Sequence, residues 1–206
     1  MVITVASHKG GVGKSTTAVH LAAYLQRLAP TLLIDGDENR SVLQWARAGK
    51  LPFTVIDERQ AAMHVRNFEH VVIDTKARAD EDDLKGIISG CHLLIVPCTP
   101  DLLSIGAMTK TLETLVRIGA KRYRVLLTII PPKPNRQGEE ARELLSARQV
   151  PLFDGGIRRT VAFQQAVAEG VTVDAVDRAG LSGQDYEKVG EEMVTQVEGY
   201  LRRTVA

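Results

Sequence analysis

Residues 7–16, SHKGGVGKST, constrain this 206-residue chain more than any other segment. A short apolar run at 2–6 precedes them, and a stretch of helical periodicity begins at about residue 15. A strand that passes through a glycine-rich turn and Gly-Lys-Ser into a helix is the setting of a phosphate-binding loop. Glycines let backbone N–H groups point at phosphate oxygens, and the helix N-terminus adds partial positive charge. The segment therefore predicts a P-loop rather than a turn that merely precedes a helix.

The loop gives its polar side chains distinct roles. We expect Lys14 to reach the β- and γ-phosphates of a nucleotide, the Ser15 hydroxyl to bind Mg²⁺ and the Thr16 hydroxyl to reach the α-phosphate. The rest of the phosphate cradle consists of Gly10, Gly11, Val12 and Gly13.

A second lysine distinguishes this loop from the usual pattern G-x-x-x-x-G-K-[ST]. His8 occupies the place of the first glycine, and Lys9 follows it. Because Lys14 already serves the nucleotide of its own chain, Lys9 could supply positive charge to a partner's phosphates, as an arginine finger does in trans. A solvated surface lysine is the alternative.

Alternating apolar runs and helical segments predict the fold. The strand-length runs are 2–6, 31–34, 53–56, 71–73, 93–96 and 125–130, and the helical segments are 15–28, 39–49, 80–89, 102–118, 138–147, 160–168 and 183–203. Strands that alternate with helices form βαβ units and a parallel sheet. We predict a doubly wound α/β fold with helices on both faces of a mostly parallel sheet, in a single domain over residues 1–206.

Three aspartates follow predicted strands. Asp35, Asp37 and Asp74 lie at strand C-terminal ends, the edge at which open parallel sheets bind ligands. Carboxylates there can hold Mg²⁺ through water or orient an attacking water. A helix N-cap or turn role is the alternative for Asp35 and Asp37.

Charge is balanced overall but not locally. Lys and Arg total 26 against 25 Asp and Glu, so composition alone predicts no nucleic-acid partner. Residues 110–136, however, carry Lys110, Arg117, Lys121, Arg122, Arg124, Lys133 and Arg136, with Glu113 as the one acid. Such a run is either a solvated face or a surface for phosphate contacts.

The loop KGGVGKST resembles the deviant Walker A motif of the ParA/MinD ATPases. Four further segments are similar to motifs of that family: LIDGD at 33–37, VVIDT at 71–75, LIVPCTP at 94–100, and GIRRT at 156–160 followed by Ala166 and Gly170. The resemblance covers roughly residues 1–175. Because the chain has no N-terminal helix-turn-helix extension, it resembles the small, single-domain ParA group.

That resemblance implies a nucleotide-driven cycle with ATP and Mg²⁺ as cofactors. An ATP-bound homodimer would form with Lys9 crossing into the partner's site, and Asp37 would position the water for slow hydrolysis. Asp74 would lie near the Mg²⁺ shell, with Asp35 supporting it. An adaptor protein would stimulate hydrolysis.

The resemblance also implies non-specific binding of double-stranded DNA and a cytoplasmic, nucleoid-associated protein. Arg158 and Arg159 match the family's basic segment, whereas Lys121, Arg122, Arg202 and Arg203 are suggested by charge alone. The expected output is plasmid or chromosome partition, with positioning of a protein compartment such as a carboxysome as the alternative.

Two details depart from the family or extend beyond it. After Asp74 and Thr75 the chain continues with Lys76, Ala77 and Arg78, whereas the family often has prolines or a glycine there, so the coupling of this loop to nucleotide is open. The turn 130–132, Ile-Pro-Pro, is our expectation for one wall of the adenine pocket, with Pro131 in contact with the base.

Three other classes compete with this interpretation. A membrane-binding C-terminal helix is disfavoured by Glu191, Glu192 and Glu198, which anionic lipid would repel. An iron–sulfur relative would need cysteines in one place, but Cys91 and Cys98 are seven residues apart across a predicted strand, which separates them by about 23 Å at ~3.3 Å per residue. A metabolic ATP-dependent enzyme could use the same loop.

Overall fold

Six parallel strands form the sheet in the computed structural model, which describes residues 1–77, 81–177 and 180–205. The strands are β1 (Val2–Val5), β2 (Thr31–Gly36), β3 (Thr54–Asp57), β4 (His70–Thr75), β5 (Leu93–Cys98) and β6 (Tyr123–Leu127). Their order is β3-β2-β4-β1-β5-β6, with β1 inside and later strands added on both sides. The doubly wound α/β fold predicted from the sequence is confirmed.

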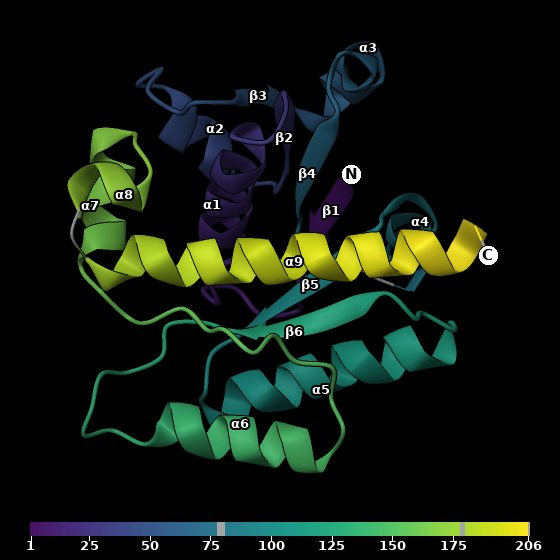
Figure 1. The fold of residues 1–206 in the computed structure, drawn as a ribbon, viewed down its shortest axis with the longest axis vertical. Helices are drawn as coiled ribbons and strands as arrows, with labels where there is room; N and C mark the ends of the chain where they lie inside the picture. Colours follow the sequence, from purple (N-terminus) through teal and green to yellow (C-terminus); the bar gives the residue numbers. More distant parts are fainter. Residues whose placement is uncertain (78–80, 178–179, 206) are drawn as a thin grey trace.

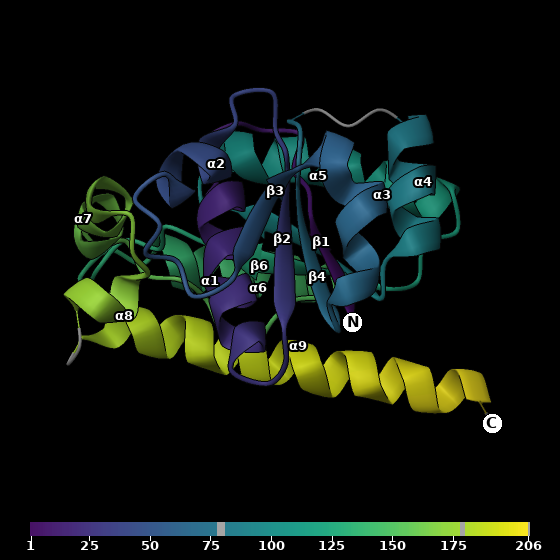
Figure 2. The ribbon, with the colours of Figure 1, turned by 90° about the horizontal axis from the view of Figure 1, so that it is seen from above.

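Helices cover both faces of this sheet. They are α1 (Lys14–Gln26), α2 (Ser41–Ala46), α3 (Ala61–His64), α4 (Glu81–Gly90), α5 (Leu102–Arg117), α6 (Gln137–Ala147), α7 (Ala162–Glu169), α8 (Val173–Val176) and α9 (Leu181–Val205). Figure 2 shows α1 and α2 on one side of the strands and α3 and α4 on the other.

Alternation along the strands divides the core into layers. Ile95 faces a cluster that includes α1 and α9, whereas its neighbours Leu94 and Val96 face a cluster that includes α5 and α6. Successive side chains of a strand point to opposite faces. The nearly continuous apolar sequence of β5 is therefore explained by helices on both sides.

Two predicted boundaries differ from the structure for a backbone reason. The last strand ends at Leu127 instead of residue 130, because Ile129 has φ 53°, which a strand does not accommodate. The predicted helix 39–49 is reduced to α2, because Arg40 also has a positive φ of 53° and Gly49 one of 65°. The short helices α3 and α8 were not predicted.

The C-terminal helix α9 packs on the domain. Its buried residues Tyr186, Val189, Met193 and Val197 recur at helical spacing and join the core cluster that contains α1. Gly190 allows the close approach, since a Cβ there would lie 2.4 Å from the Tyr24 ring. Figure 1 shows α9 running across the molecule in front of the strands. None of the helices in the described ranges is long and apolar enough to cross a membrane.

Candidate nucleotide-binding site

The P-loop connects β1 to α1 at the C-terminal edge of the sheet. Gly11 and Gly13 have φ values of 76° and 82°, a region that side-chain-bearing residues rarely adopt, so these glycines set the path of the loop. Val12 is buried, and its carbonyl accepts a hydrogen bond from the Thr128 hydroxyl at 2.8 Å. Thr128, which the sequence analysis did not single out, therefore fixes the loop to the end of β6.

Lys14 and Asp37 form a buried ion pair inside this site. The Lys14 Nζ lies 3.6 Å from the Asp37 Oδ2, and each side chain is only 7% exposed. The other Asp37 oxygen accepts hydrogen bonds from the backbone and side-chain nitrogens of Asn39. The sequence-predicted phosphate lysine and water-positioning aspartate are therefore brought together.

Asp35 faces its own loop rather than the P-loop. Its two carboxylate oxygens accept the backbone N–H groups of Asp37 at 3.1 Å and Leu43 at 2.9 Å. The side chain is fully buried. Asp35 thus holds the segment that carries Asp37.

Asp74 is a buried carboxylate without a hydrogen-bond partner among the described residues. It pairs in register with Asp35 on β2 and Val5 on β1. Burial raises the pKa of Asp74 to about 7 and the charges of Asp35 and Asp37 add to this, while Ser15 and Lys14 oppose it. An unsatisfied buried carboxylate beside a serine hydroxyl offers the oxygen ligands that Mg²⁺ prefers, so Ser15 and Asp74 fit a magnesium site.

Lys9, the second lysine of the loop, forms an ion pair with Asp101 at the start of α5. Its Nζ lies 3.1 Å from the Asp101 Oδ1, and the Lys9 side chain is 35% exposed. Asp101 is also the N-cap of α5, accepting the Ser104 N–H at 2.9 Å. In the sequence, the turn followed by a helix at 99–104 is the one signal for Asp101, and it indicates an N-cap. No local pattern indicates that Asp101 pairs with Lys9.

Beside the P-loop lies a cavity of about 160 Å³. It is lined by Gly13, Thr16, Thr128, Ile129, Ile157, Arg158, Arg159, Thr160, Phe163, Gln164 and Tyr186. We call it the base cavity, because a predominantly apolar cavity of roughly this size accepts one aromatic ring. Pro131 is not among its described lining residues, whereas Ile129, two positions earlier, is one of them.

The predicted basic residues lie at opposite ends of the sheet. Lys121 and Arg122 directly precede β6, whereas Arg158 pairs with Ile130 beyond its C-terminal end. The five-residue strand separates the two groups by roughly 17 Å. One subunit therefore has two separate basic positions in place of a continuous surface.

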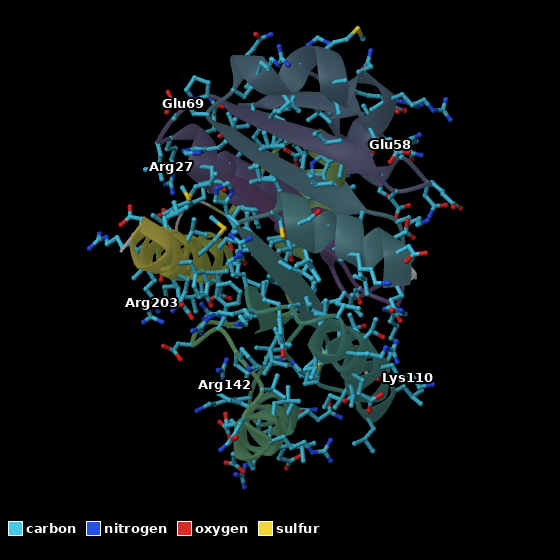
Figure 3. All side chains as sticks on the ribbon, turned by 90° about the vertical axis from the view of Figure 1, so that its right-hand side faces the viewer. Arg27, Glu58, Glu69, Lys110, Arg142 and Arg203 are labelled. Atoms are coloured by element: carbon cyan, nitrogen blue, oxygen red, sulfur yellow. The ribbon has the colours of Figure 1, made fainter. Side chains whose placement is uncertain are left out.

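Several cations of the 110–136 run are engaged in ion pairs. Arg117 pairs with Glu81, Arg124 with Glu192 and Arg136 with Glu139. Figure 3 shows Lys110 and Arg203 on opposite flanks of the molecule. The local charge excess is therefore smaller than the sequence suggests.

The departures from the family pattern also have positions in the structure. Lys76, after Asp74, pairs with Asp83 on α4 at 2.7 Å; Arg78 lies outside the described residues.

Cys91 and Cys98 are both buried free cysteines at opposite ends of β5. This arrangement gives no shared cysteine site on one chain.

Comparison with protein-family models identifies the chain. Residues 3–173 match the CobQ/CobB/MinD/ParA nucleotide binding domain. The chain belongs to this family. The resemblance found in the P-loop thus extends over most of the sequence.

Individual family members are similar over different lengths. The "Maintenance of carboxysome distribution protein A" of Gloeobacter kilaueensis is 32% identical over 203 residues, 93% of each chain. "Protein ParA" of Rhizobium radiobacter is 34% identical over 151 residues, 64% of this chain and 65% of the relative. An ATP complex of a variant of McdA from Cyanothece has a TM-score of 0.68 at 18% identity and covers 96% of both chains, which shows a common fold.

Proposed function

We propose that this chain is a ParA-type positioning ATPase in which ATP drives formation of a homodimer. The observation that carries the proposal is the different placement of the two loop lysines. Lys14 is buried against Asp37, whereas Lys9 is partly exposed and turned out of its own site. Lys14 would serve the nucleotide of its own chain, and Lys9 would leave its ion pair with Asp101 to reach the nucleotide of a second chain.

The phosphates of ATP would lie on residues 10–16. Lys14 would exchange its carboxylate partner, Asp37, for the terminal phosphates, and Thr16 would face the α-phosphate. When bound at Ser15 and Asp74, Mg²⁺ would neutralise charge on the β- and γ-phosphate oxygens. The base would enter the base cavity, next to Gly13 and Thr16.

Release of Asp37 from Lys14 on ATP binding would leave Asp37 free to act in hydrolysis. An aspartate that loses its ion pair keeps its charge and its two hydrogen bonds from Asn39, so it stays oriented. It can then accept a hydrogen bond from a water aligned with the γ-phosphate. Nucleotide binding and water positioning are thereby coupled through one side chain.

The dimer would bind double-stranded DNA without sequence preference. Each Lys or Arg that reaches a phosphate releases a counterion, and two subunits double the number of such contacts. Arg159 is the favoured contact on the nucleotide side, since its side chain makes no hydrogen bond or ion pair with the described residues. Lys121 and Arg122 are exposed or half-buried at the other end of the sheet. Such binding would associate the protein with the nucleoid in the cytoplasm.

The similarity to a carboxysome distribution protein over 93% of both chains supports a protein compartment as the cargo. The ParA relative supports plasmid or chromosome partition, but matches about two thirds of each chain. Both outputs use the same cycle, in which an adaptor on the cargo stimulates hydrolysis and frees the monomers.

Dimerisation tests the proposal directly. Light scattering with a slowly hydrolysed ATP analogue and Mg²⁺ reports dimerisation, and a titration with the same analogue reports nucleotide binding. The wild type should bind the analogue and dimerise. Lys14→Ala should bind no nucleotide, and Lys9→Ala should bind nucleotide but stay monomeric. Lys50→Ala, a change at another exposed lysine, is the control and should dimerise normally. An ATP-stabilised dimer of Lys9→Ala would remove the trans role of Lys9.

A further inference from the structure

We infer that Arg158 and Asp185 form a clamp that positions the wall of the base cavity, so that Arg158 is a positioning residue for nucleotide binding rather than a DNA contact. This inference rests on the proposed nucleotide binding. It assigns different tasks to two adjacent arginines that look equivalent in the sequence.

The contact between the two side chains is multiple and short. The Arg158 Nε lies 2.9 and 3.2 Å from the two Asp185 carboxylate oxygens, and its Nη2 lies 2.6 Å from Oδ1. The same Nη2 donates to the Leu181 carbonyl at 2.9 Å. A guanidinium held in this two-pronged way is fixed in orientation, as well as in position.

Asp185 also holds the backbone of its partner. Its Oδ2 accepts the Arg158 N–H at 3.0 Å, and the aspartate side chain is only 8% exposed. A carboxylate that binds both the backbone and the side chain of one residue restrains the chain at that point. This geometry is that of a structural attachment: Nε and Nη2 are engaged within the chain, although the side chain as a whole is still 40% exposed.

The attached segment, residues 157–160, forms one wall of the base cavity. Its backbone runs beside the chain after β6: Ile157 donates to Leu127 at 2.9 Å, and Arg159 donates to Ile130 at 2.8 Å. Those bonds secure the segment on the β6 side, and Asp185 secures it on the α9 side. Ile157, Arg159 and Thr160 are therefore presented to the cavity from a backbone held on two sides.

The first turns of α9 hold a second wall of the same cavity. Tyr186, next to Asp185, lines the cavity, and its hydroxyl lies 3.2 Å from the Thr17 hydroxyl on α1. Its ring stacks on His20 at a centroid distance of 4.6 Å. Of two consecutive residues of α9, Asp185 thus holds the wall at Arg158 and Tyr186 contacts the P-loop helix, so loosening either connection should disturb the base site.

The neighbouring Arg159 lines the same cavity but has no such clamp on its side chain. Its backbone N–H bonds to Ile130, but its side chain has no hydrogen-bond or ion-pair partner in the described part of the chain. The two arginines should therefore respond differently to substitution, with nucleotide affinity depending on Arg158.

Calorimetry with two probes tests the clamp. We would titrate the full-length chain with the slowly hydrolysed ATP analogue and, separately, with inorganic tripolyphosphate, both with Mg²⁺. Arg158→Gln and Asp185→Asn should each weaken binding of the ATP analogue about tenfold, the scale of a lost charged hydrogen bond. Tripolyphosphate, which has no base, should bind as it does to the wild type.

The double variant and a matched control complete the experiment. Arg158→Gln with Asp185→Asn should lose little more than either single change, because both remove the same clamp. Arg27→Gln breaks another ion pair to α9, with Glu187, at a position that does not line the base cavity. It should leave both affinities unchanged.

Distinct results would overturn the clamp. If the variants bind both probes more weakly to the same extent, the effect is a general loss of structure. If Arg158→Gln keeps its affinity for the ATP analogue but loses DNA binding, Arg158 is a DNA contact. A wild-type chain that binds the ATP analogue no better than tripolyphosphate would instead contradict the proposed nucleotide function itself.

Discussion

Lys9 is held within its own chain by Asp101, with 3.1 Å between the ammonium nitrogen and the nearer carboxylate oxygen. A lysine that is to reach a partner's phosphates must first leave this ion pair. The side chains are 35% and 46% exposed, so the pair contributes at most about 1 kcal/mol. It is therefore a weak restraint that bound ATP in a second subunit can overcome.

Asp101→Asn should favour the ATP-bound dimer. Asparagine caps a helix as well as aspartate does, so α5 keeps its N-cap, while Lys9 loses its charged partner. Because a symmetric dimer releases two such pairs, the protein concentration at half-dimerisation should fall by up to about 30-fold, measured by analytical ultracentrifugation with the ATP analogue. Combining the change with Lys9→Ala should abolish the gain; a gain that persists would place the effect elsewhere on α5.

Asp37→Asn should separate nucleotide binding from hydrolysis. The amide keeps the size of the side chain but cannot act as a base, so turnover should fall by about 100-fold or more. Affinity for ATP should be equal or higher, because Lys14 no longer has a competing carboxylate 3.6 Å away. Phosphate release and ATP binding measured side by side check both effects, with Glu38→Gln at the exposed next residue as the control. Normal turnover in Asp37→Asn would remove Asp37 from catalysis.

Two glycines of α9 should respond in opposite directions to alanine. A Cβ at Gly190 would lie 2.4 Å from the Tyr24 ring, whereas one at Gly199 would have nothing within 4 Å. Gly190→Ala should lower the free energy of unfolding by about 1–3 kcal/mol through overpacking. Gly199→Ala should raise it by up to about 1 kcal/mol through helix propensity. Urea denaturation checks both; equal effects would show that α9 does not pack on α1 at Gly190.

His20 should make stability depend on pH. Burial lowers the pKa of His20 from 6.5 to about 4, although the Thr16 carbonyl and Asp174 oppose this. Between these values the unfolded chain binds a proton that the folded chain excludes, so the free energy of unfolding rises with pH from about 4 to 6.5 and is fully retained above that range. The His20 share of the loss on acidification is roughly 3 kcal/mol.

His20→Gln isolates this contribution. The variant should be less stable near pH 7, because it loses packing on Tyr186, but the gap to the wild type should narrow as the pH falls from 6.5 to 4. Denaturation curves at several pH values give both free energies. A gap that stays constant over this range would contradict a neutral, buried His20.

The fold and the centre of the site were predictable because their signals are local. Each strand is an apolar run, and the C-terminal ends of parallel strands meet at one edge, which brought Asp37 and Asp74 to the P-loop. Boundaries failed at Ile129 and Arg40, where a positive φ at an ordinary residue leaves no clear trace in the sequence.

The long-range ion pairs could not be predicted. Lys9 and Asp101 are 92 positions apart, and Arg158 and Asp185 are 27 apart. Charge patterns show which residues could pair, but only the folded chain shows which of them do. For this reason the two arginines at 158 and 159 looked alike, whereas of the two only the Arg158 side chain makes a hydrogen bond or ion pair within the described residues.

Binding to random-sequence duplex DNA, measured with ADP and with the slowly hydrolysed ATP analogue at two salt concentrations, tests the nucleotide switch most directly. The account predicts binding only with the ATP analogue, falling steeply with salt as counterion release requires. Equal binding in both nucleotide states, or no binding in either, would contradict a DNA-bound state controlled by ATP.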